Sequence, residues 1–215
     1  MPIPNFKERM FCSLTQEFFD PSVDSNKTAI ILAGGASRRF GRDKAWALWE
    51  GKPLIEILID RLKQLGFEMM LSGSNPRLKE WGLPVVEDAC PLQGPLQALK
   101  GIWEKNSASR ILLVACDMPF IEPDVIQTLW SAATDSDILI LEGEGSPSPL
   151  PGVYRRTTYP FVESLLKKGR RDLKALWSEP LKISVISRQL LHILDPVQKS
   201  LWNVNTPQDL SILIE

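Results

Sequence analysis

The stretch TAIILAGGASRRFGRDK, residues 28–44, carries the strongest structural signal in this chain, because an apolar run enters a loop of glycines and cations. Residues 28–33 predict a buried strand, and Gly34 and Gly35 lack side chains, which lets backbone amides approach a phosphate. The loop then carries four cations opposed only by Asp43, namely Arg38, Arg39, Arg42 and Lys44. This concentration of positive charge predicts a polyanionic ligand such as a triphosphate.

Two familiar phosphate-binding loops do not match this stretch. A Walker A loop has four spacer residues and then Gly-Lys-Ser/Thr, whereas five residues separate Gly35 from Gly41 and Arg42 follows. The dinucleotide-binding pattern GxGxxG is absent as well. A surface loop whose arginines are merely solvated is the alternative, and the coincidence of glycines, cations and a preceding strand disfavours it.

Downstream of this stretch, strands and helices are expected to alternate. Strands are predicted at 68–71, 84–86, 110–116, 137–141, 153–155 and 182–187, and helices at 53–65, 76–81, 95–104, 123–133, 159–167 and after Thr206-Pro207. Pro53 is expected at the first helical position, Gly66 at the stop, and residues 142–152, EGEGSPSPLPG, in a turn-rich loop. The alternation predicts a single-domain, Rossmann-like α/β fold with a mostly parallel twisted sheet and helices on both faces.

In such a sheet, ligands bind beyond the carboxyl ends of the strands, which directs attention to the loops after Ala33 and Cys116. Asp117 directly follows the apolar strand 110–116, so it would place one carboxylate at the ligand edge. Mg²⁺ takes one or two carboxylates and fills its remaining positions with phosphate oxygens and water. A turn or cap before Pro119 is the plainer role for Asp117.

The segment LWNVNTPQDL, residues 201–210, contains a sound helix start at Thr206-Pro207, and by itself it is structural. Asn203 and Asn205 become relevant if they face Asp117, because an asparagine oxygen can serve as a second, neutral ligand of Mg²⁺.

The composition narrows the classes of protein to which this chain can belong. Its 215 residues are 44% hydrophobic and 24% charged, with a net charge of -1, so the basic excess of a general nucleic-acid or anionic-membrane binder is missing. The single histidine, His192, excludes a multi-histidine metal site. Three widely spaced cysteines and only short apolar runs lead us to expect a cytoplasmic protein without a membrane span. Residues 1–27 read as an N-terminal arm and linker, and residues 28–215 as the folded domain.

With these motifs assembled, the sequence resembles the molybdenum cofactor guanylyltransferases, within the sugar-nucleotide-pyrophosphorylase-like nucleotidyltransferases. The opening pattern of that family, LAGG-x-S-x-R-M-G-x-D-K, is similar to LAGGASRRFGRDK here. Three further segments match the family, namely ACDMPFI around Asp117, NVNTP at 203–207, and VVED at 85–88 followed by GPL at 94–96. The doubled glycine, in place of Ala-Gly, favours the guanylyl branch over the cytidylyl branch.

The resemblance implies transfer of GMP from GTP to the terminal phosphate of molybdopterin, with Mg²⁺ as cofactor and pyrophosphate as leaving group. It also implies a set of site residues: the loop Leu32, Ala33, Gly34 and Gly35 holding the nucleotide, Lys44 binding phosphate, Asp88 contacting the nucleotide, Arg39 steadying pyrophosphate and Asp117 binding Mg²⁺. Ser72 occupies the position of an asparagine that binds nucleotide in some members. Transfer of this kind needs positioning and neutralisation of charge, since the acceptor phosphate is already a nucleophile.

The expected partners are therefore GTP and molybdopterin, with transient contact to cofactor-biosynthesis or acceptor proteins, and neither nucleic acid nor membrane. The basic residues Arg170 and Arg171 are a candidate contact for the pterin phosphate. The family segment GPLAG is altered by Gln97, which leaves room for a related nucleotidyltransferase that uses CTP or a sugar phosphate. A non-catalytic nucleotide-binding module, with the N-terminal arm as its interaction segment, is the remaining alternative.

Overall fold

The computed structural model describes residues 27–34, 44–87, 94–133 and 135–211. Its strands are β1 (Lys27–Leu32), β2 (Leu48–Trp49), β3 (Lys52–Pro53), β4 (Phe67–Ser72), β5 (Val85–Val86), β6 (Arg110–Ala115), β7 (Ile138–Glu142), β8 (Pro147–Arg155) and β9 (Ile183–Ile186). Its α-helices are α2 (Leu54–Gln64), α3 (Pro95–Lys105), α4 (Pro123–Ala132), α5 (Tyr159–Lys167), α6 (Arg188–Leu194) and α7 (Pro207–Ser211). Short 3₁₀ helices complete the described part: η1 (Lys44–Trp46), η2 (Pro76–Trp81), η3 (Arg156–Thr158), η4 (Leu173–Ser178) and η5 (Lys199–Leu201).

The described strands form a seven-stranded sheet in the order β5-β4-β1-β6-β8-β7-β9, and β2 and β3 form a separate pair. β1 pairs in parallel with both β4 and β6, and β7 pairs in parallel with β9. Only β8 runs the other way among these seven, antiparallel to β6 and to β7. The mostly parallel sheet confirms the fold class that the alternation of strands and helices predicts.

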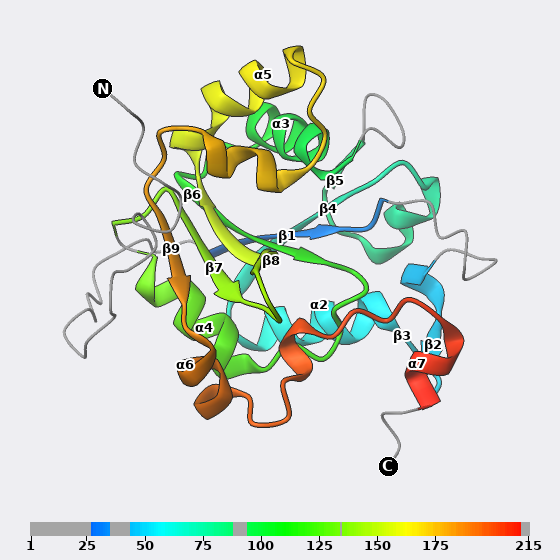
Figure 1. The fold of residues 1–215 in the computed structure, drawn as a ribbon. Helices are drawn as coiled ribbons and strands as arrows, with labels where there is room; N and C mark the ends of the chain where they lie inside the picture. Colours follow the sequence, from blue (N-terminus) through cyan, green and yellow to red (C-terminus); the bar gives the residue numbers. More distant parts are fainter. Residues whose placement is uncertain (1–26, 35–43, 88–93, 134, 212–215) are drawn as a thin grey trace.

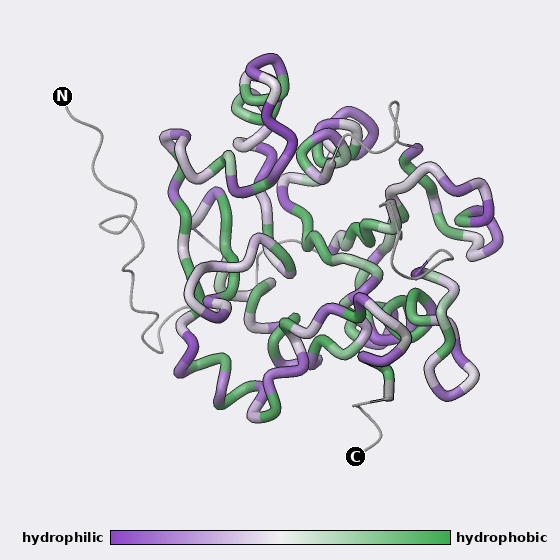
Figure 2. The backbone as a smooth tube through the Cα atoms, turned by 45° about the vertical axis from the view of Figure 1, so that its right-hand side comes forward, coloured by the Kyte–Doolittle hydropathy of each residue, from purple (hydrophilic) through white to green (hydrophobic). Residues whose placement is uncertain are grey.

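Helices cover both faces of this sheet (Figure 1). One face packs against α2, α4 and α6, and the other packs against α3, α5 and η4. Along β1, Ala29 and Ile31 point into the first core while Ile30 and Leu32 point into the second. A strand buried on both faces needs apolar residues at every position, which is why residues 29–33 read as one continuous apolar run. Figure 2 shows the hydrophobic colour concentrated along these central strands, with hydrophilic segments on the outer turns.

Two arginine side chains cap the carboxyl ends of α4 and α3, a task for which many helices use a glycine. The guanidinium of Arg110, buried in β6, stacks on Trp130 at 4.2 Å and donates to the carbonyls of Trp130 and Ala133 at the end of α4. Arg156 donates to the carbonyl of Trp103 in the last turn of α3. These bonds satisfy carbonyl groups that a helix leaves unpaired at its carboxyl end.

The prediction of a loop over residues 142–152 is wrong for most of that stretch, because β7 extends to Glu142 and β8 already begins at Pro147. Proline lacks the N–H of a ladder bond and is tolerated only where a strand does not need that donor. The register of β8 with β6 runs from Arg155 to Gly152, so the proline-containing first half of β8 projects past the paired part of β6. Composition predicts a turn there, and pairing with β7 makes a strand.

Smaller differences concern the ends of elements. Pro53 is the last residue of β3 and the N-cap of α2, with an extended ψ of 140°, so the helix begins one residue later than predicted. Gly66 does end that helix region, at a φ of +76° that favours glycine. The helices α6 and η4 were not predicted. The proposed N-terminal arm falls outside the described residues except for Lys27, which opens β1. Within the described ranges no helix is both long and apolar enough to cross a bilayer.

Candidate active site

The strand order creates a topological switch point between β1 and β6. From β1 the chain proceeds to β4 and β5 on one side, and then returns to β6 on the other side of β1. The connecting helices α2 and α3 accordingly lie on opposite faces of the sheet (Figure 1). Open α/β sheets bind their ligands beyond the carboxyl ends of the strands at such a point. The residues that follow β1 and β6 are therefore the first candidates for a site.

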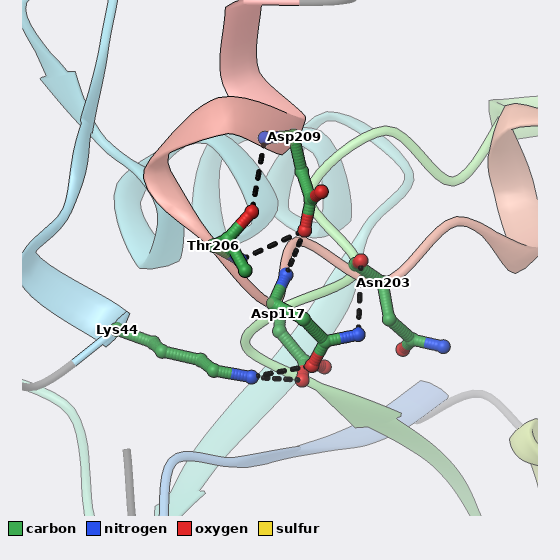
Figure 3. Close-up of polar contacts among 6 residues, drawn as sticks. Lys44, Asp117, Asn203, Thr206 and Asp209 are labelled. Carbon is green, nitrogen blue, oxygen red and sulfur yellow. Dashed lines mark hydrogen bonds and ion pairs between the residues drawn. The ribbon is translucent and has the colours of Figure 1, made fainter. Parts of the chain in front are cut away.

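Three of the predicted site residues meet at this edge. The ammonium of Lys44 donates to Oδ1 of Asn205 at 2.7 Å and forms an ion pair with Oδ2 of Asp117 at 3.3 Å (Figure 3). The side chains of Lys44 and Asp117 are 17% and 22% exposed, so both remain accessible to a ligand. The sequence made Asn205 relevant only if it faces Asp117. It does so, because its amide oxygen and the carboxylate of Asp117 both contact the ammonium of Lys44.

A small apolar cluster holds the three chain segments together beneath these polar groups. Its buried members are Ala47, Leu54, Phe120 and Val204. Ala47 lies three residues after Lys44, Phe120 lies three residues after Asp117, and Val204 directly precedes Asn205. Trp49 packs on Phe120 with ring centroids 4.9 Å apart. Burial of these apolar groups is thus the force that brings the polar residues into contact.

Backbone hydrogen bonds then set the position of Asp117. The N–H of Val204 donates to the carbonyl oxygen of Asp117 at 2.8 Å, and the N–H of Cys116 donates to that of Leu32 at 3.0 Å. The carboxylate oxygen Oδ1 of Asp117 is buried and has no hydrogen-bond partner among the described residues. An orphaned carboxylate oxygen beside an amide oxygen is a donor set that suits a hard divalent cation.

The end of β1 presents backbone rather than side chains. Leu32 and Ala33 are buried, whereas Gly34 is exposed. The N–H of Ala33 donates to the carbonyl of Ser72 at 2.7 Å. Ala33 would therefore contact a ligand through its carbonyl oxygen. Ser72 is only 1% exposed, and its part in the described structure is to hold Ala33 through that carbonyl.

The remaining predicted site residues are either outside the described residues or not in contact with Lys44 in the bonds given above. Gly35, Arg39 and Asp88 fall outside the described residues, and their roles stay predictions. Asn203 is exposed, and its carbonyl accepts from the side chain of Asn205 at 3.3 Å. The basic residues Arg170 and Arg171 are exposed beside the start of α3, where the carbonyl of Arg171 accepts the N–H of Leu96.

One residue next to the site was not identified from the sequence. The carboxylate of Asp209 in α7 accepts the backbone N–H groups of Asn205 and Thr206 at 2.6 and 2.8 Å. The bond from Asn205, followed by that from Thr206, holds the pKa of Asp209 below its ordinary value. The signal was present in the sequence, because Thr206 followed three residues later by an acidic residue is a capping-box pattern.

A cavity of about 640 Å³ opens at the same carboxyl edge of the sheet, where β7 ends and β8 begins. Its lining includes Pro147 and Ser148 of β8, the cations Lys174 and Arg188, and Trp202, which precedes Asn203 in the chain. The cavity therefore adjoins the segment that carries Asn205. It offers an aromatic ring and two cations, together with the carboxylates of Glu142 and Glu144, of which Glu144 pairs with Arg188 at 3.5 Å.

Comparison with known proteins identifies the family of this chain. The family model described as the MobA-like NTP transferase domain matches residues 29–182. A probable molybdenum cofactor guanylyltransferase of Carboxydothermus hydrogenoformans is 30% identical over 190 residues, covering 88% of this chain and 96% of that protein. The molybdenum cofactor guanylyltransferase of Desulfosudis oleivorans is 31% identical over 186 residues, covering 85% and 92%.

Solved structures share the fold. The crystal structure of molybdopterin-guanine dinucleotide biosynthesis protein A from Archaeoglobus fulgidus superposes with a TM-score of 0.72. The two sequences are 24% identical, and the match covers 86% of this chain and 95% of the other. At this level of identity the superposition supports the fold, and the relatives above carry the family relationship.

Proposed function

This chain belongs to the MobA-like NTP transferase family and is a nucleotidyltransferase, and from this premise we propose that it transfers GMP from GTP to the terminal phosphate of molybdopterin. The observation that carries the proposal is the meeting of Lys44, Asp117 and Asn205 at the switch point of the sheet. The names of the relatives support guanylyl transfer in molybdenum cofactor synthesis. The cytoplasmic location expected from the sequence stays a prediction.

The residues at the site fit a divalent cation, which we propose to be Mg²⁺. Asp117 supplies a carboxylate with one oxygen that no described residue contacts by a hydrogen bond, and Asn205 supplies an amide oxygen. When bound, such a cation neutralises negative charge on the phosphates of the nucleotide. In the structure Lys44 satisfies one oxygen of each residue, so a cation bound by both would compete with this ammonium.

When a metal ion displaces the Lys44 ammonium from Asp117 and Asn205, the ammonium can bind the phosphates of the nucleotide instead. Its ammonium is a compact charge on a flexible stem, anchored by the buried Ala45 next to it. A triphosphate placed over the exposed Gly34 would attract this charge away from the carboxylate of Asp117. We therefore assign phosphate binding to Lys44, and metal binding to Asp117 and Asn205.

The chemistry requires little beyond this arrangement. A phosphate oxygen of the acceptor attacks the α-phosphorus of GTP, and the bond from that phosphorus to the pyrophosphate oxygen breaks. No protein nucleophile takes part, because the acceptor oxygen is already anionic. The chain positions the two phosphates in line and supplies positive charge where the leaving group gains negative charge. Arg39 is assigned to that leaving group on the resemblance alone.

We place the acceptor in the cavity beyond β7 and β8. Trp202 can stack on a flat ring and Lys174 carries charge suited to a phosphate, while Arg188 pairs with Glu144 and would have to leave that carboxylate to bind one. Because Trp202 lies three residues before Asn205, an acceptor bound there would lie next to the segment that carries a proposed metal ligand.

Calorimetric titration of the full chain with GTP and with CTP, each with and without Mg²⁺, tests the nucleotide. We expect Mg²⁺-dependent binding of GTP and much weaker binding of CTP. Addition of molybdopterin should then release pyrophosphate in proportion to the product formed. Preference for CTP would move the protein to the cytidylyl branch, and tight GTP binding without pyrophosphate release would favour a non-catalytic module.

A pair of lysine variants sharpens this measurement. Lys44→Met should weaken GTP binding by about 10- to 100-fold, the worth of a charged hydrogen bond. Lys52→Met is the matched control, since Lys52 lies nearby but pairs with Glu56 and Asp60 on α2. Equal affinities in both variants would contradict the role assigned to Lys44.

A further inference from the structure

Asp209 makes two hydrogen bonds that serve different purposes. Its oxygen Oδ2 accepts from the N–H of Thr206 at 2.8 Å, which is the bond of an ordinary capping box. The same oxygen accepts from the N–H of Asn205 at 2.6 Å, one residue farther from the helix (Figure 3). The capping box of α7 consists of the first bond and the reciprocal bond from the Asp209 N–H to Thr206 Oγ1, and it does not require the second. The second bond reaches the residue whose side chain contacts Lys44.

The bonds around Asn205 leave its backbone little freedom. On one side, the N–H of Val204 is held by the carbonyl of Asp117 at 2.8 Å. On the other side, Asp209 holds the N–H groups of Asn205 and Thr206. With successive backbone groups fixed, the direction of the Cα–Cβ bond of Asn205 is set, and its Oδ1 lies 2.7 Å from the ammonium of Lys44.

The charge of Asp209 strengthens this arrangement. Hydrogen bonds from N–H groups to a carboxylate are about twice as strong as those to a neutral acceptor. The carboxylate also lies at the amino-terminal end of α7, where the helix favours negative charge. Lys44 contributes a favourable electrostatic interaction with Asp209 as well, which links this carboxylate to the site without direct contact.

We infer that Asp209 is a positioning residue, which holds the amide of Asn205 toward Lys44 and Asp117 through its hydrogen bond to the Asn205 backbone. The inference rests on the proposed function, because it gives Asp209 a part in binding nucleotide and metal. Asp209 itself touches neither reactant. Its role resembles that of outer residues that orient the ligands of a metal site, whose removal costs about 10- to 100-fold in affinity or activity.

Thr206 provides the control that separates positioning from capping. Its Oγ1 accepts the N–H of Asp209 at 3.3 Å, so Thr206→Ala weakens the cap of α7 but leaves both bonds to the carboxylate in place. Asp209→Ala removes the carboxylate bonds to Thr206 and to Asn205 together, and leaves the backbone N–H at position 209 able to donate to Thr206 Oγ1. If the helix cap were all that mattered, both variants would lose similar stability and similar affinity.

The experiment measures two affinities for each variant, that of Mn²⁺ alone by electron paramagnetic resonance and that of nucleotide with Mn²⁺ by calorimetry. The nucleotide is whichever of GTP, CTP, UTP and ATP the wild-type chain binds best, so a wrong base in the proposed function leaves the test intact. We expect Asp209→Ala to weaken both affinities by about 10- to 100-fold, Thr206→Ala by less than about 3-fold, and Asp209→Glu to restore most of the loss.

A double-mutant cycle with Asn205→Ala then identifies the route of the effect. If Asp209 acts through Asn205, adding Asp209→Ala to Asn205→Ala should cost less than about 3-fold further. Full additivity of the two losses would overturn the inference, as would equal losses in Asp209→Ala and Thr206→Ala. Thermal unfolding of each variant confirms that the affinities refer to folded protein.

Discussion

On one side of β6 the strands β5, β4 and β1 all run parallel to it, and on the other side β8 runs against both of its neighbours. The parallel half ends its strands at the switch point and supplies Lys44 and Asp117 to the site. The half built on β8 supplies part of the cavity wall, and the segment that follows its edge strand β9 supplies Asn205. The two halves of the sheet thus have different roles. Crossover helices place successive strand ends side by side, whereas a hairpin strand returns in the opposite direction.

The clearest way to break this comparison is to remove one aspartate from each half. Asp117→Ala should lower guanylyl transfer by at least about 10³-fold, because charge at the phosphates loses its stabilisation. Asp137, in the β8 half, accepts hydrogen bonds from the Lys182 backbone at 2.8 Å and from the Thr157 hydroxyl. Asp137→Ala should therefore lower stability while the folded protein keeps its turnover rate. A kinetic assay of pyrophosphate release, with thermal unfolding of both variants, makes the measurement, and comparable turnover in both would contradict the division of work.

The next test concerns packing in the β8 half. A Cβ added at Gly152 would lie 2.9 Å from the Ile140 side chain and 3.1 Å from the carbonyl oxygen of Pro149. Gly152→Ala should therefore lower the free energy of unfolding by about 1–3 kcal/mol, measured by chemical denaturation. In the parallel half, Gly101 of α3 has only an ordinary contact at 3.6 Å, so Gly101→Ala should be neutral or stabilise by up to about 1 kcal/mol. Equal destabilisation in both variants would show that the two halves tolerate added volume alike.

The smallest expected effect is a change in alkaline stability. Tyr154 of β8 is buried, its hydroxyl donates to the carbonyl of Pro149 at 2.7 Å, and burial raises the pKa of Tyr154 above its ordinary value. The stabilisation from this neutral phenol is complete below the unfolded pKa of about 10, and it is lost as the pH rises above that value.

Tyr154→Phe should cost about 1 kcal/mol at neutral pH, through the lost hydrogen bond, and should show a shallower decline of stability above pH 10 or so. Tyr159→Phe is the comparison, because Tyr159 is only half-buried at the surface of α5, and its pKa is raised by partial burial and then by the nearby Glu163 and Glu104. It therefore shows how much of the decline a surface phenol accounts for. Denaturant unfolding at a series of alkaline pH values makes the comparison. An unchanged alkaline decline in Tyr154→Phe would show that this phenol does not set it.

The two halves also differ in how far the sequence predicted them. In the parallel half, residues 29–33 and 111–114 are apolar at every position, and glycine or proline borders the helices between strands, so local composition predicts the elements within a residue or two. In β8, Pro147, Pro149 and Gly152 each favour a turn locally. Pairing with β6 and β7 outweighs that preference, and no pattern within residues 147–155 predicts this pairing.

The candidate site shows the same division at the scale of single residues. Lys44 and Asp117 were predicted because each lies just after or within a loop at the end of an apolar strand. Asn205 was predicted only on the condition that it faces Asp117, and Asp209 was missed although its capping-box spacing is visible. Gly35, Arg39 and Asp88 stay predictions, because they lie outside the described residues.

Local sequence therefore decided which residue types stand at the strand ends, since buried strands and glycine loops have short-range signatures. Tertiary packing decided which of them meet. The contact between Lys44 and Asn205 depends on a cluster in which Ala47, Phe120 and Val204 come from three distant segments. Apolar burial has no direction of its own, so its partners are chosen only when the whole chain closes on itself. For the same reason, the antiparallel strand β8 and the hydrogen bond from the Asn205 backbone to Asp209 could be identified only in the folded molecule.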